Sequence, residues 1–394
     1  MTSWQDIERQ YYMQTVRRQP VTIVRGQGTR VWDENEKEYL DFTAGWAVNN
    51  LGHCHPVIVD AIRAQAATLL QTSNQFYTLP QLQLAQLLVE NSCLDRVFFS
   101  NSGAEANEGA VKLARKYGRL HRNGAYEVIT ALNSFHGRTM AMVAATGQPH
   151  YQENWKPLPE GFVNVEYNDL EAIRQATTDK TCAVMLEPLQ GEGGVNIPEE
   201  GYLKAVREWC NEKDLLLLFD EVQTGLGRLG TLFGYQSFNV EPDVMTLAKG
   251  LGGGVPIGAF LATDRAAVLE PGDHGSTFGG NALTCAAAYA SSRYIVDNDI
   301  AGQAKEMGFY LTAGLQGLKE RVPAIIDVRG MGLLIAVEFN ADISAKVLTA
   351  CNEEGLLLNA VRPNAIRLMP PLTITRQEVD QGLERLERGL RQVA

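Results

Sequence analysis

Six short apolar runs, separated by segments of helical periodicity, occupy residues 55–290 and constrain the fold more than any other feature. They lie at residues 97–99, 127–130, 183–186, 215–219, 244–247 and 257–262. Alternation of buried strands with helices indicates an α/β protein with a mostly parallel sheet, covered by helices on both faces. Open sheets of this kind bind ligands at the carboxyl ends of their strands. The residues that follow the runs are therefore the first candidates for a functional site.

The two ends of the chain have a different pattern. Toward the N-terminus we expect a helix at residues 6–18 and strands at residues 21–24, 29–32 and 38–41. After about residue 290 the pattern predicts a helix at residues 302–320, strands such as 333–339, and a closing amphipathic helix from residue 376. A chain of 394 residues exceeds the usual size of one core, so we expect two domains.

The composition excludes several classes of protein. Hydrophobic residues make up 45% and charged residues 21%, which is typical of a soluble globular protein. The net charge of −11 argues against nucleic acid or an anionic membrane as a partner, because both attract a basic face. No apolar stretch approaches the roughly 20 residues of a membrane helix, and the first residues have no secretory or transit character. Six scattered cysteines indicate reduced thiols in a cytoplasmic protein: Cys54, Cys93, Cys182, Cys210, Cys285 and Cys351.

Asp220 and Lys249 each stand where a buried apolar run ends. Asp220 follows the run 215–219, and Lys249 follows the next run and precedes Gly250. Pyridoxal phosphate needs both residue types: a lysine amine to bond with its aldehyde, and a carboxylate to keep its pyridine nitrogen protonated. Either residue alone would be an ordinary surface, turn or cap residue. The pair predicts a pyridoxal phosphate site.

A phosphate site is predicted after the first apolar run. Residues 100–108 lead from the run 97–99 into an amphipathic helix, with Ser102 as the expected N-cap and Glu105 in the first turn. The N-terminus of a helix presents unpaired amide groups and the positive end of its dipole, and both favour a phosphate. On its own this segment would be an ordinary capped helix, but beside Asp220 and Lys249 it completes a cofactor site.

Eight segments, in order and covering nearly the whole chain, resemble the class III aminotransferases of fold-type I, and most closely the acetylornithine/ornithine aminotransferase group. They are GHCHP (52–56), SNSGAEANE (100–108), FHGR (135–138), EPLQGEGG (187–194), DEVQTGLGRLG (220–230), AKG (248–250), HGSTFGGN (274–281) and RLMPPL (367–372). The resemblance implies a large pyridoxal-phosphate-binding domain at residues 55–290. It also implies a smaller α+β domain built from both termini, residues 1–54 and 291–394, and a homodimer with shared active sites.

The resemblance also implies how the cofactor is held. Lys249 bonds with pyridoxal 5'-phosphate and later acts as the base, and Asp220 pairs with the pyridine nitrogen. Gln223 binds the ring hydroxyl, and Phe135 stacks on the ring. The remaining residues hold the phosphate, with Thr277 contributed by the neighbouring subunit: Ser102, Gly103, Ala104 and Thr277.

Substrate binding is implied in the same way. Arg367 takes the α-carboxylate of glutamate or 2-oxoglutarate, and Arg138 takes the far carboxylate. Glu192 pairs with Arg367 while an ω-amine donor is bound. The resemblance adds Ser276 and Trp46, the latter in a loop where related proteins carry a smaller apolar residue or a tyrosine. Glu187 is expected only to support its loop.

The predicted reaction transfers the ω-amino group of N-acetylornithine to 2-oxoglutarate. Because a bulky Trp46 could favour another donor, ornithine, 4-aminobutyrate and other acylated diamino acids stay open. The tetrameric state and the pathway are not predicted.

Two motifs suggest rival functions. Residues 225–230 read G-x-G-x-x-G, the fingerprint of a nicotinamide-dependent oxidoreductase. Five residues separate this motif from its strand, and no helical pattern follows it, so we disfavour that class. His53, Cys54 and His55 resemble a metal clip, but no second ligand pair stands at structural-zinc spacing, and we predict no metal site. A non-catalytic scaffold would tolerate loss of Asp220 or Lys249, and both are present.

Overall fold

The computed structural model describes residues 3–393 and is built around a seven-stranded sheet. Six strands run in one direction, and β10 is antiparallel to both of its neighbours, β4 and β9. This arrangement confirms the expected mostly parallel sheet and adds β6, which the sequence analysis missed. In spatial order the strands are β4 (Arg96–Ser100), β10 (Gly258–Ala262), β9 (Val244–Leu247), β8 (Leu216–Asp220), β7 (Thr181–Leu186), β5 (Glu127–Ala131) and β6 (Phe162–Val165).

Alternate residues of the central strands supply two separate cores. In β8, Leu217 and Phe219 join a cluster that includes residues of α9 (Tyr202–Glu212). Leu216 and Leu218 join a second cluster with α5 (Gly103–His121). Since successive side chains of a strand point to opposite faces and both faces are buried here, β8 is apolar from Leu216 to Phe219, which explains its unbroken leucine run. The expected layer of helices on both faces is therefore present.

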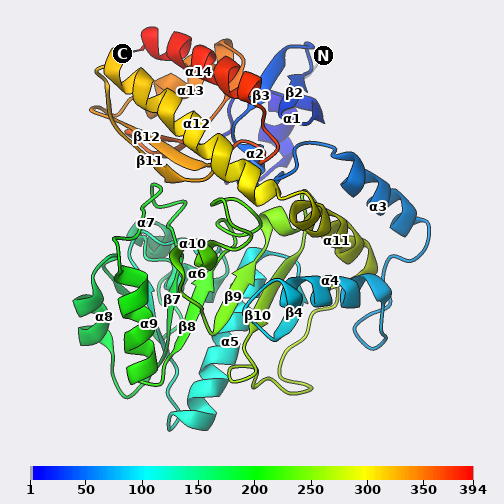
Figure 1. The fold of residues 1–394 in the computed structure, drawn as a ribbon, viewed down its shortest axis with the longest axis vertical. Coiled ribbons are helices and arrows are strands. Elements are labelled where there is room, and N and C mark those ends of the chain that lie inside the picture. The colour runs from blue at the N-terminus through cyan, green and yellow to red at the C-terminus, as the bar shows by residue number, and fades with distance from the viewer. Residues whose placement is uncertain (1–2, 394) are drawn as a thin grey trace.

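Two further sheets lie at the other end of the molecule, where the blue and red ends of the chain come together (Figure 1). In the first, the C-terminal β13 pairs in parallel with the N-terminal β3, so both ends of the chain contribute to one sheet. That sheet has the order β1 (Ile23–Gln27), β2 (Arg30–Asp33), β3 (Glu38–Asp41), β13 (Leu356–Leu357). The second has the order β11 (Ile325–Met331), β12 (Leu334–Phe339), β15 (Ala365–Leu368), β14 (Asn359–Arg362).

The remaining helices cover these sheets or connect them. Near the N-terminus are α1 (Trp4–Tyr11), α2 (Ala44–Ala47), α3 (Pro56–Ala66) and α4 (Leu79–Glu90). Around the central sheet are α6 (Met140–Ala145), α7 (Pro149–Gln152), η1 (Glu153–Trp155), α8 (Leu170–Ala176), α10 (Gly234–Phe238) and η2 (Lys249–Leu251). The C-terminal part has α11 (Ala282–Asp297), α12 (Ile300–Arg321), α13 (Ser344–Glu353) and α14 (Arg376–Arg391). The proposed domain boundary at 290/291 falls inside α11, and both domain limits stay a prediction.

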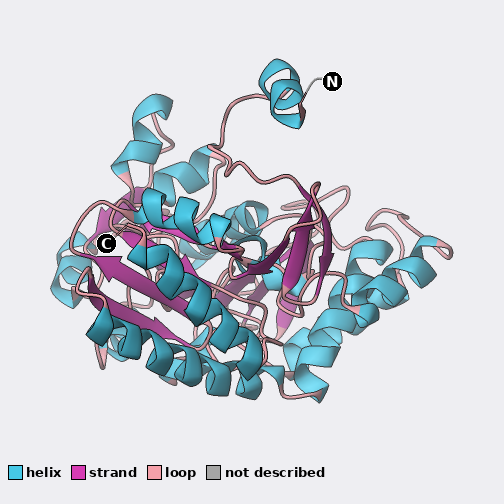
Figure 2. Ribbon diagram, turned by 90° about the horizontal axis from the view of Figure 1, so that it is seen from above, coloured by secondary structure: helices cyan, strands magenta, loops and turns pink. Residues whose placement is uncertain are grey.

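The predicted N-terminal helix at residues 6–18 is wrong in its second half. The helix begins at Trp4, after a capping box at Ser3, and ends at Tyr11. It buries none of its residues and projects from the body of the chain in Figure 2. Short helices depend on tertiary packing for stability, so nothing extends this one to residue 18. The strand expected at residues 21–24 is likewise shifted, to Ile23–Gln27.

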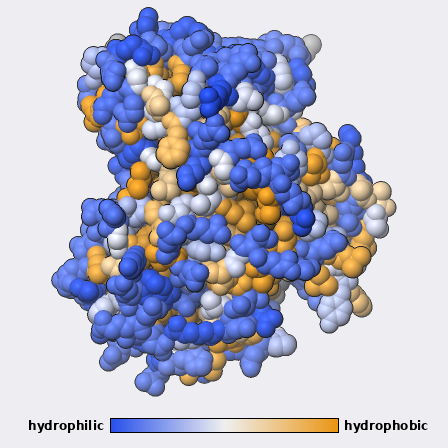
Figure 3. Space-filling model, in the orientation of Figure 1, coloured by the Kyte–Doolittle hydropathy of each residue, from blue (hydrophilic) through white to orange (hydrophobic). Residues whose placement is uncertain are grey.

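The surface matches the acidic, polar composition. Hydrophilic side chains cover most of the face in Figure 3, and hydrophobic ones gather across its middle. No helix in the described part of the chain has the length and apolar character needed to cross a membrane.

Candidate active site

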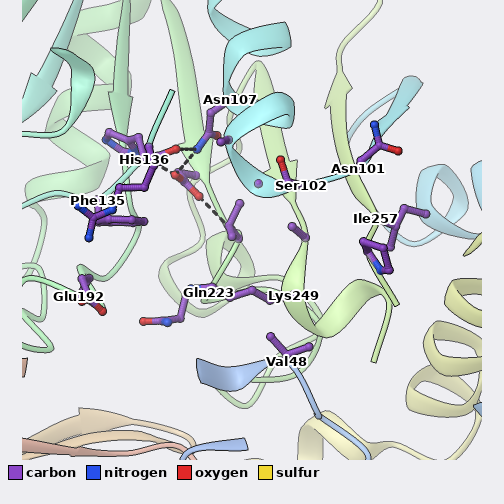
Figure 4. A pocket seen from close by; sticks show the side chains of 18 of the residues that line it. Val48, Asn101, Ser102, Asn107, Phe135, His136, Glu192, Gln223, Lys249 and Ile257 are labelled. Carbon is purple, nitrogen blue, oxygen red and sulfur yellow. Dashed lines mark hydrogen bonds and ion pairs between the residues drawn. The ribbon is translucent and has the colours of Figure 1, made fainter. Parts of the chain in front are cut away.

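A cavity of about 450 Å³ opens at the carboxyl ends of the central strands. Its walls come from the segments that follow β4, β5, β7, β8 and β9, and from the residues just before β10. In Figure 4, Phe135 and Glu192 lie on one side of Lys249, and Asn101, Ser102 and Ile257 lie on the other. The cavity is therefore where a parallel sheet is expected to bind its ligand.

Asp220 is the last residue of β8 and is held by three hydrogen bonds. His136 Nδ1 lies 2.8 Å from its Oδ2, Asn107 Nδ2 donates to the same oxygen at 2.7 Å, and the Val222 amide donates to Oδ1 at 3.0 Å. Asn107 also donates to the His136 carbonyl oxygen at 2.7 Å and accepts a bond from Thr246 at 2.7 Å. These contacts fix the direction of a buried carboxylate. Neither Asn107 nor His136 was predicted from the sequence to have a role in the site.

Lys249 follows β9 and begins the short turn η2, with a backbone φ of 43°. Burial, together with the smaller effect of the nearby charge of Arg367, lowers the pKa of its amine to about 8, against the opposing effects of Glu192 and Asp220. A lysine with such a pKa carries a large neutral fraction at mildly alkaline pH. Neutral amines are the nucleophilic and basic form, so the site favours the chemistry predicted for Lys249.

The N-terminus of α5 borders the same cavity. Ser102 is its N-cap, as expected, and its Oγ accepts a bond from the Glu105 amide at 3.2 Å. The amides of Gly103 and Ala104 donate to no protein oxygen within residues 3–393. A Cβ on Gly103 would lie 2.8 Å from Val222, so the absence of a side chain lets this turn pack against the segment that follows β8. Two free amides at a helix N-terminus suit an anion.

Glu187 joins two walls of the cavity. Its Oε1 accepts a bond from the Phe135 amide at 2.9 Å, and its Oε2 accepts one from the Gly191 amide at 3.1 Å. Burial raises the pKa of Glu187 to about 7, although the neighbouring His136 and these bonds oppose the shift. Glu187 therefore fixes the segment that carries Phe135 relative to the segment that carries Glu192.

Arg367 is fully buried on β15 and contacts three segments. Its Nη2 donates to Glu192 Oε2 at 2.8 Å, and its Nη1 donates to Gln223 Oε1 at 2.9 Å. Its Nε and Nη2 both donate to Asn359 Oδ1, at 3.2 and 2.8 Å. The structure thus contains the Glu192–Arg367 ion pair that the sequence analysis predicted. It also shows two partners, Gln223 and Asn359, that were not expected there.

Arg138 lines the cavity without a partner carboxylate. Its guanidinium carbon lies 3.8 Å from the centroid of the Tyr151 ring and 5.3 Å from that of Phe135. It makes no hydrogen bond or ion pair with another described residue. The aromatic rings hold the charge by cation–π attraction and leave its donors free for a ligand.

Four predicted site residues do not line this cavity: Trp46, Ser276, Thr277 and Arg367, the last of which contacts the lining residues Glu192 and Gln223. Trp46 is 54% exposed and lies in the turn α2, where Ala44, Trp46 and Ala47 all have left-handed φ values. Asp41 stabilises this turn by accepting bonds from the amides of residues 43 and 44. As a result Val48, and not Trp46, faces the cavity. Ser276 accepts a bond from Asn101 at 3.1 Å, and Thr277 is exposed.

Comparison with known proteins decides the family. A model of the family described as aminotransferase class-III matches residues 11–390. This chain is a class III aminotransferase. It is 48% identical to an acetylornithine aminotransferase of Caldanaerobacter subterraneus, covering 98% of both chains. It is 50% identical to one of Methanocaldococcus jannaschii, covering 98% of this chain and 97% of the relative.

Solved structures agree with this assignment. The ornithine aminotransferase of Toxoplasma gondii has a TM-score of 0.95 and 37% identity, over 100% of this chain and 96% of that one. The N-acetylornithine aminotransferase of Stenotrophomonas maltophilia has a TM-score of 0.85 and 38% identity, over 98% of each chain. The predicted fold and reaction class are confirmed.

In this class III aminotransferase the G-x-G-x-x-G motif has a packing role. A Cβ on Gly227 would lie 2.8 Å from Leu372, and one on Gly230 would lie 2.8 Å from Lys305. Between them Arg228 is fully buried and donates to the carbonyl oxygens of Leu333 and Pro370. The glycines let this segment approach the C-terminal part of the chain. At the other rejected motif, His53 Nε2 lies 2.7 Å from Asp41, and the His55 ring packs against Tyr294.

Proposed function

We propose that this aminotransferase moves the terminal amino group of N-acetyl-L-ornithine to 2-oxoglutarate, giving the semialdehyde and glutamate. The observation that carries the proposal is the ion pair between Glu192 and the fully buried Arg367 at the cavity. An arginine that needs a carboxylate for one substrate and a masking partner for the other fits an enzyme with two unlike substrates. The names of the relatives, at 44–50% identity, favour acetylornithine over ornithine as the donor.

The residues around the cavity suit pyridoxal 5'-phosphate. Lys249 would bond with the cofactor aldehyde, and Asp220 would pair with the pyridine nitrogen. Phe135 would cover the ring, and Gln223 Nε2 is free to bind the ring hydroxyl because Oε1 accepts from Arg367. The phosphate would lie at the N-terminus of α5, on residues 102–104. When bound, the cofactor supplies the aldehyde that receives the amino group and the electron sink that stabilises the substrate carbanion.

Proton transfer is the work of Lys249. With a pKa of about 8, a large fraction of its amine is neutral at mildly alkaline pH and can accept a proton from the substrate carbon that bears the amino group. Asp220 stays in place because His136 and Asn107 hold one of its oxygens, so its charge acts from a fixed position. The two hydrogen bonds that Glu187 accepts, from the amides of Phe135 and Gly191, hold Phe135 and the Glu192 segment in a fixed relative position.

Two arginines distinguish the substrates. Acetylornithine presents an amine with no neighbouring carboxylate, so Arg367 keeps Glu192 as its partner while that donor reacts. Glutamate carries an α-carboxylate beside its amine, and Glu192 must withdraw to admit it. Arg138, whose donors are free, would bind the carboxylate at the far end of either substrate.

We also propose that the enzyme is a homodimer. Large exposed hydrophobic residues gather between α3 and α4, at the start of α4 and in the loop before α11: Leu69, Leu70, Phe76, Tyr77, Leu79, Leu82 and Phe278. Gln71 donates to the Thr277 carbonyl oxygen, and Asn74 donates to that of Ser276 at 3.0 Å, so the two segments form one surface. An apolar surface of this kind is typical of a subunit interface. Thr277 would reach the partner's phosphate across it, with Ser276 beside the substrate.

We also propose a cytoplasmic location, from the state of the cysteines. All six cysteines are free thiols, and four of them are buried. Buried thiols without disulfide partners fit a reducing compartment.

The test is a panel of amine donors assayed against 2-oxoglutarate, without nicotinamide. N-acetylornithine should give the highest kcat/KM, ahead of ornithine and 4-aminobutyrate. If ornithine or 4-aminobutyrate exceeded it, the assigned donor would be wrong although the reaction class would stand. If Trp46→Tyr changed the order of kcat/KM among donors of different size, Trp46 would lie near the substrate, as predicted.

Glu192→Ala tests how the site accepts two substrates. Removing the masking carboxylate should lower the single-turnover rate with acetylornithine by about tenfold or more, since the buried guanidinium then lacks its only partner of opposite charge among the described residues. The rate with glutamate should be kept or raised. Arg138→Ala should instead weaken both half-reactions, because each substrate places a carboxylate there. Equal losses for both donors in Glu192→Ala would refute the masking role.

A further inference from the structure

Asn359 is the partner of Arg367 that neither the sequence nor the cavity wall would suggest. It lies on β14, directly opposite Arg367 on the antiparallel strand β15. Residues opposite each other on neighbouring strands place their side chains on the same face, within contact distance. Because arginine has no acceptor, the amide oxygen of Asn359 must be the group that faces it.

The position of this oxygen decides which part of the guanidinium is left for other ligands. Asn359 Oδ1 bridges Nε and Nη2, at 3.2 and 2.8 Å, and so occupies the side edge of the planar fork. The second N–H of Nη2 then lies on the side of Nη1, and Glu192 Oε2 accepts this hydrogen bond at an Nη2–Oε2 distance of 2.8 Å. Gln223 accepts one N–H of Nη1. Four of the five donors thus bind protein oxygens within the described chain.

Withdrawal of Glu192 therefore exposes only one edge of Arg367. The Nη1 and Nη2 groups form the end of the fork, and a carboxylate can bind there in bidentate fashion. The side edge cannot accept it, because Asn359 remains in place. A substrate carboxylate is thus directed to the position that Glu192 has vacated, in a single orientation.

The chemical type of residue 359 matters as much as its position. An amide satisfies two N–H groups without cancelling the positive charge, so the charge remains for Glu192 or for the substrate. A carboxylate in the same place would neutralise Arg367 permanently.

We propose that Asn359 is a specificity-determining residue that blocks the side edge of Arg367 with a neutral acceptor, and so reserves its end edge and its charge for the α-carboxylate of glutamate or 2-oxoglutarate. This inference rests on the proposed function, in which Arg367 binds that carboxylate.

The experiment compares Asn359→Asp with Asn359→Leu in the holoenzyme. Single-turnover rates with acetylornithine and glutamate are measured separately, and calorimetry gives the affinity for glutarate, a dicarboxylate that cannot react. Asn359→Asp should weaken glutarate binding and the glutamate half-reaction by about tenfold or more, while acetylornithine changes by less than about twofold. Asn359→Leu keeps the charge but frees the side edge. It should retain glutarate affinity and lower the saturating rate with glutamate.

A double variant tests whether a carboxylate at position 359 can mask the charge of Arg367 when Glu192 is absent. In Glu192→Ala/Asn359→Asp, the new carboxylate should replace the lost masking charge and restore much of the acetylornithine rate that Glu192→Ala loses. Glutamate should stay impaired. Retained cofactor absorbance and an unchanged melting temperature show that each variant is folded.

Three results would overturn the inference. They are unchanged glutarate affinity in Asn359→Asp, equal losses with both donors, or no recovery in the double variant. Arg367→Met separates this failure from that of the proposed function. If Arg367→Met loses glutamate and glutarate binding while Asn359→Asp does not, only the role of Asn359 is wrong. If Arg367→Met retains both, Arg367 is not the carboxylate site.

Discussion

Substituting Gly191 tests the contact between Arg367 and Gln223 without touching either residue. A Cβ on Gly191 would lie 1.8 Å from Gln223 Oε1, and its other nearest atoms also belong to the Gln223 side chain. Gly191 has no left-handed φ, so an alanine fits the backbone. The only atoms that must yield are the end of one flexible side chain. Gly191→Ala should therefore fold normally and displace Gln223.

The size of the effect follows from the bond that is broken. Gln223 Oε1 accepts from Arg367 at 2.9 Å, and relieving the overlap moves this oxygen by more than about 1 Å, beyond hydrogen-bond range. A hydrogen bond to a charged group contributes about 1.5–3 kcal/mol, equivalent to about 10- to 100-fold in rate or affinity. We expect a loss of that size in glutamate turnover, and weaker pyridoxal phosphate binding because Gln223 is proposed to hold the ring hydroxyl.

Gly317→Ala is the matched control. Gly317 lies in α12, and the nearest atom to its added Cβ is Arg321 Nη1 at 3.6 Å. The change should leave activity intact and stabilise the helix by up to about 1 kcal/mol. Half-reaction rates, cofactor titration and melting temperature are measured for both variants. Wild-type rates and cofactor affinity in Gly191→Ala would refute the displacement of Gln223, and a large loss of melting temperature would show that the backbone yields instead.

Two further predictions concern the catalytic groups. The first concerns Lys249 in protein freed of cofactor, where labelling by an amine reagent is followed by mass spectrometry. The extent of labelling should rise with pH, with a midpoint at about 8, because burial lowers the pKa of Lys249 and only the neutral amine reacts. A midpoint near the ordinary value of 10.5 would contradict this prediction. Asp220→Asn should lower turnover by about a hundredfold or more with unchanged circular dichroism, since the neutral amide cannot stabilise a protonated pyridine nitrogen, and near-normal turnover would remove Asp220 from the catalytic groups.

The positions of Asp220 and Lys249 at one sheet edge could be predicted because each residue stands at the end of a strand that the sequence pattern identifies. An acid that ends one buried strand and a lysine that ends the next must come to the same sheet edge, whatever lies between them. The pairing of Glu192 with Arg367 came from the family resemblance, since 175 residues separate them. Asn107 could have been recognised from the sequence, because it interrupts the apolar face of α5 beside Ala106 and Ala110. A polar residue on a buried face needs a partner, and here the partner is Asp220.

Other features could not be read from the sequence. Asn359 faces Arg367 only because β14 and β15 pair in one register, and their pairing is irregular between Ala360 and Arg362. The left-handed turn of α2 contains Ala44, Trp46 and Ala47, residue types that rarely adopt such φ values. It persists because Asp41 and the surrounding packing hold it. The side-chain directions at these two places were therefore set by strand register and by the conformation of a strained turn, neither of which the sequence pattern reveals.

The Glu192–Arg367 pair also affects the base of the reaction. The charge of Arg367 lowers the pKa of Lys249, and the charge of Glu192 raises it, so the two effects oppose each other while the pair is intact. If Glu192 withdrew and nothing replaced it, the amine would become a weaker base. A substrate carboxylate bound to Arg367, as proposed, would restore the missing negative charge at nearly the same place. In the proposed mechanism Lys249 would therefore meet a similar electrostatic environment in both half-reactions, and one lysine could serve as the base for two unlike substrates. Asn359, being neutral, leaves this exchange of one carboxylate for another undisturbed.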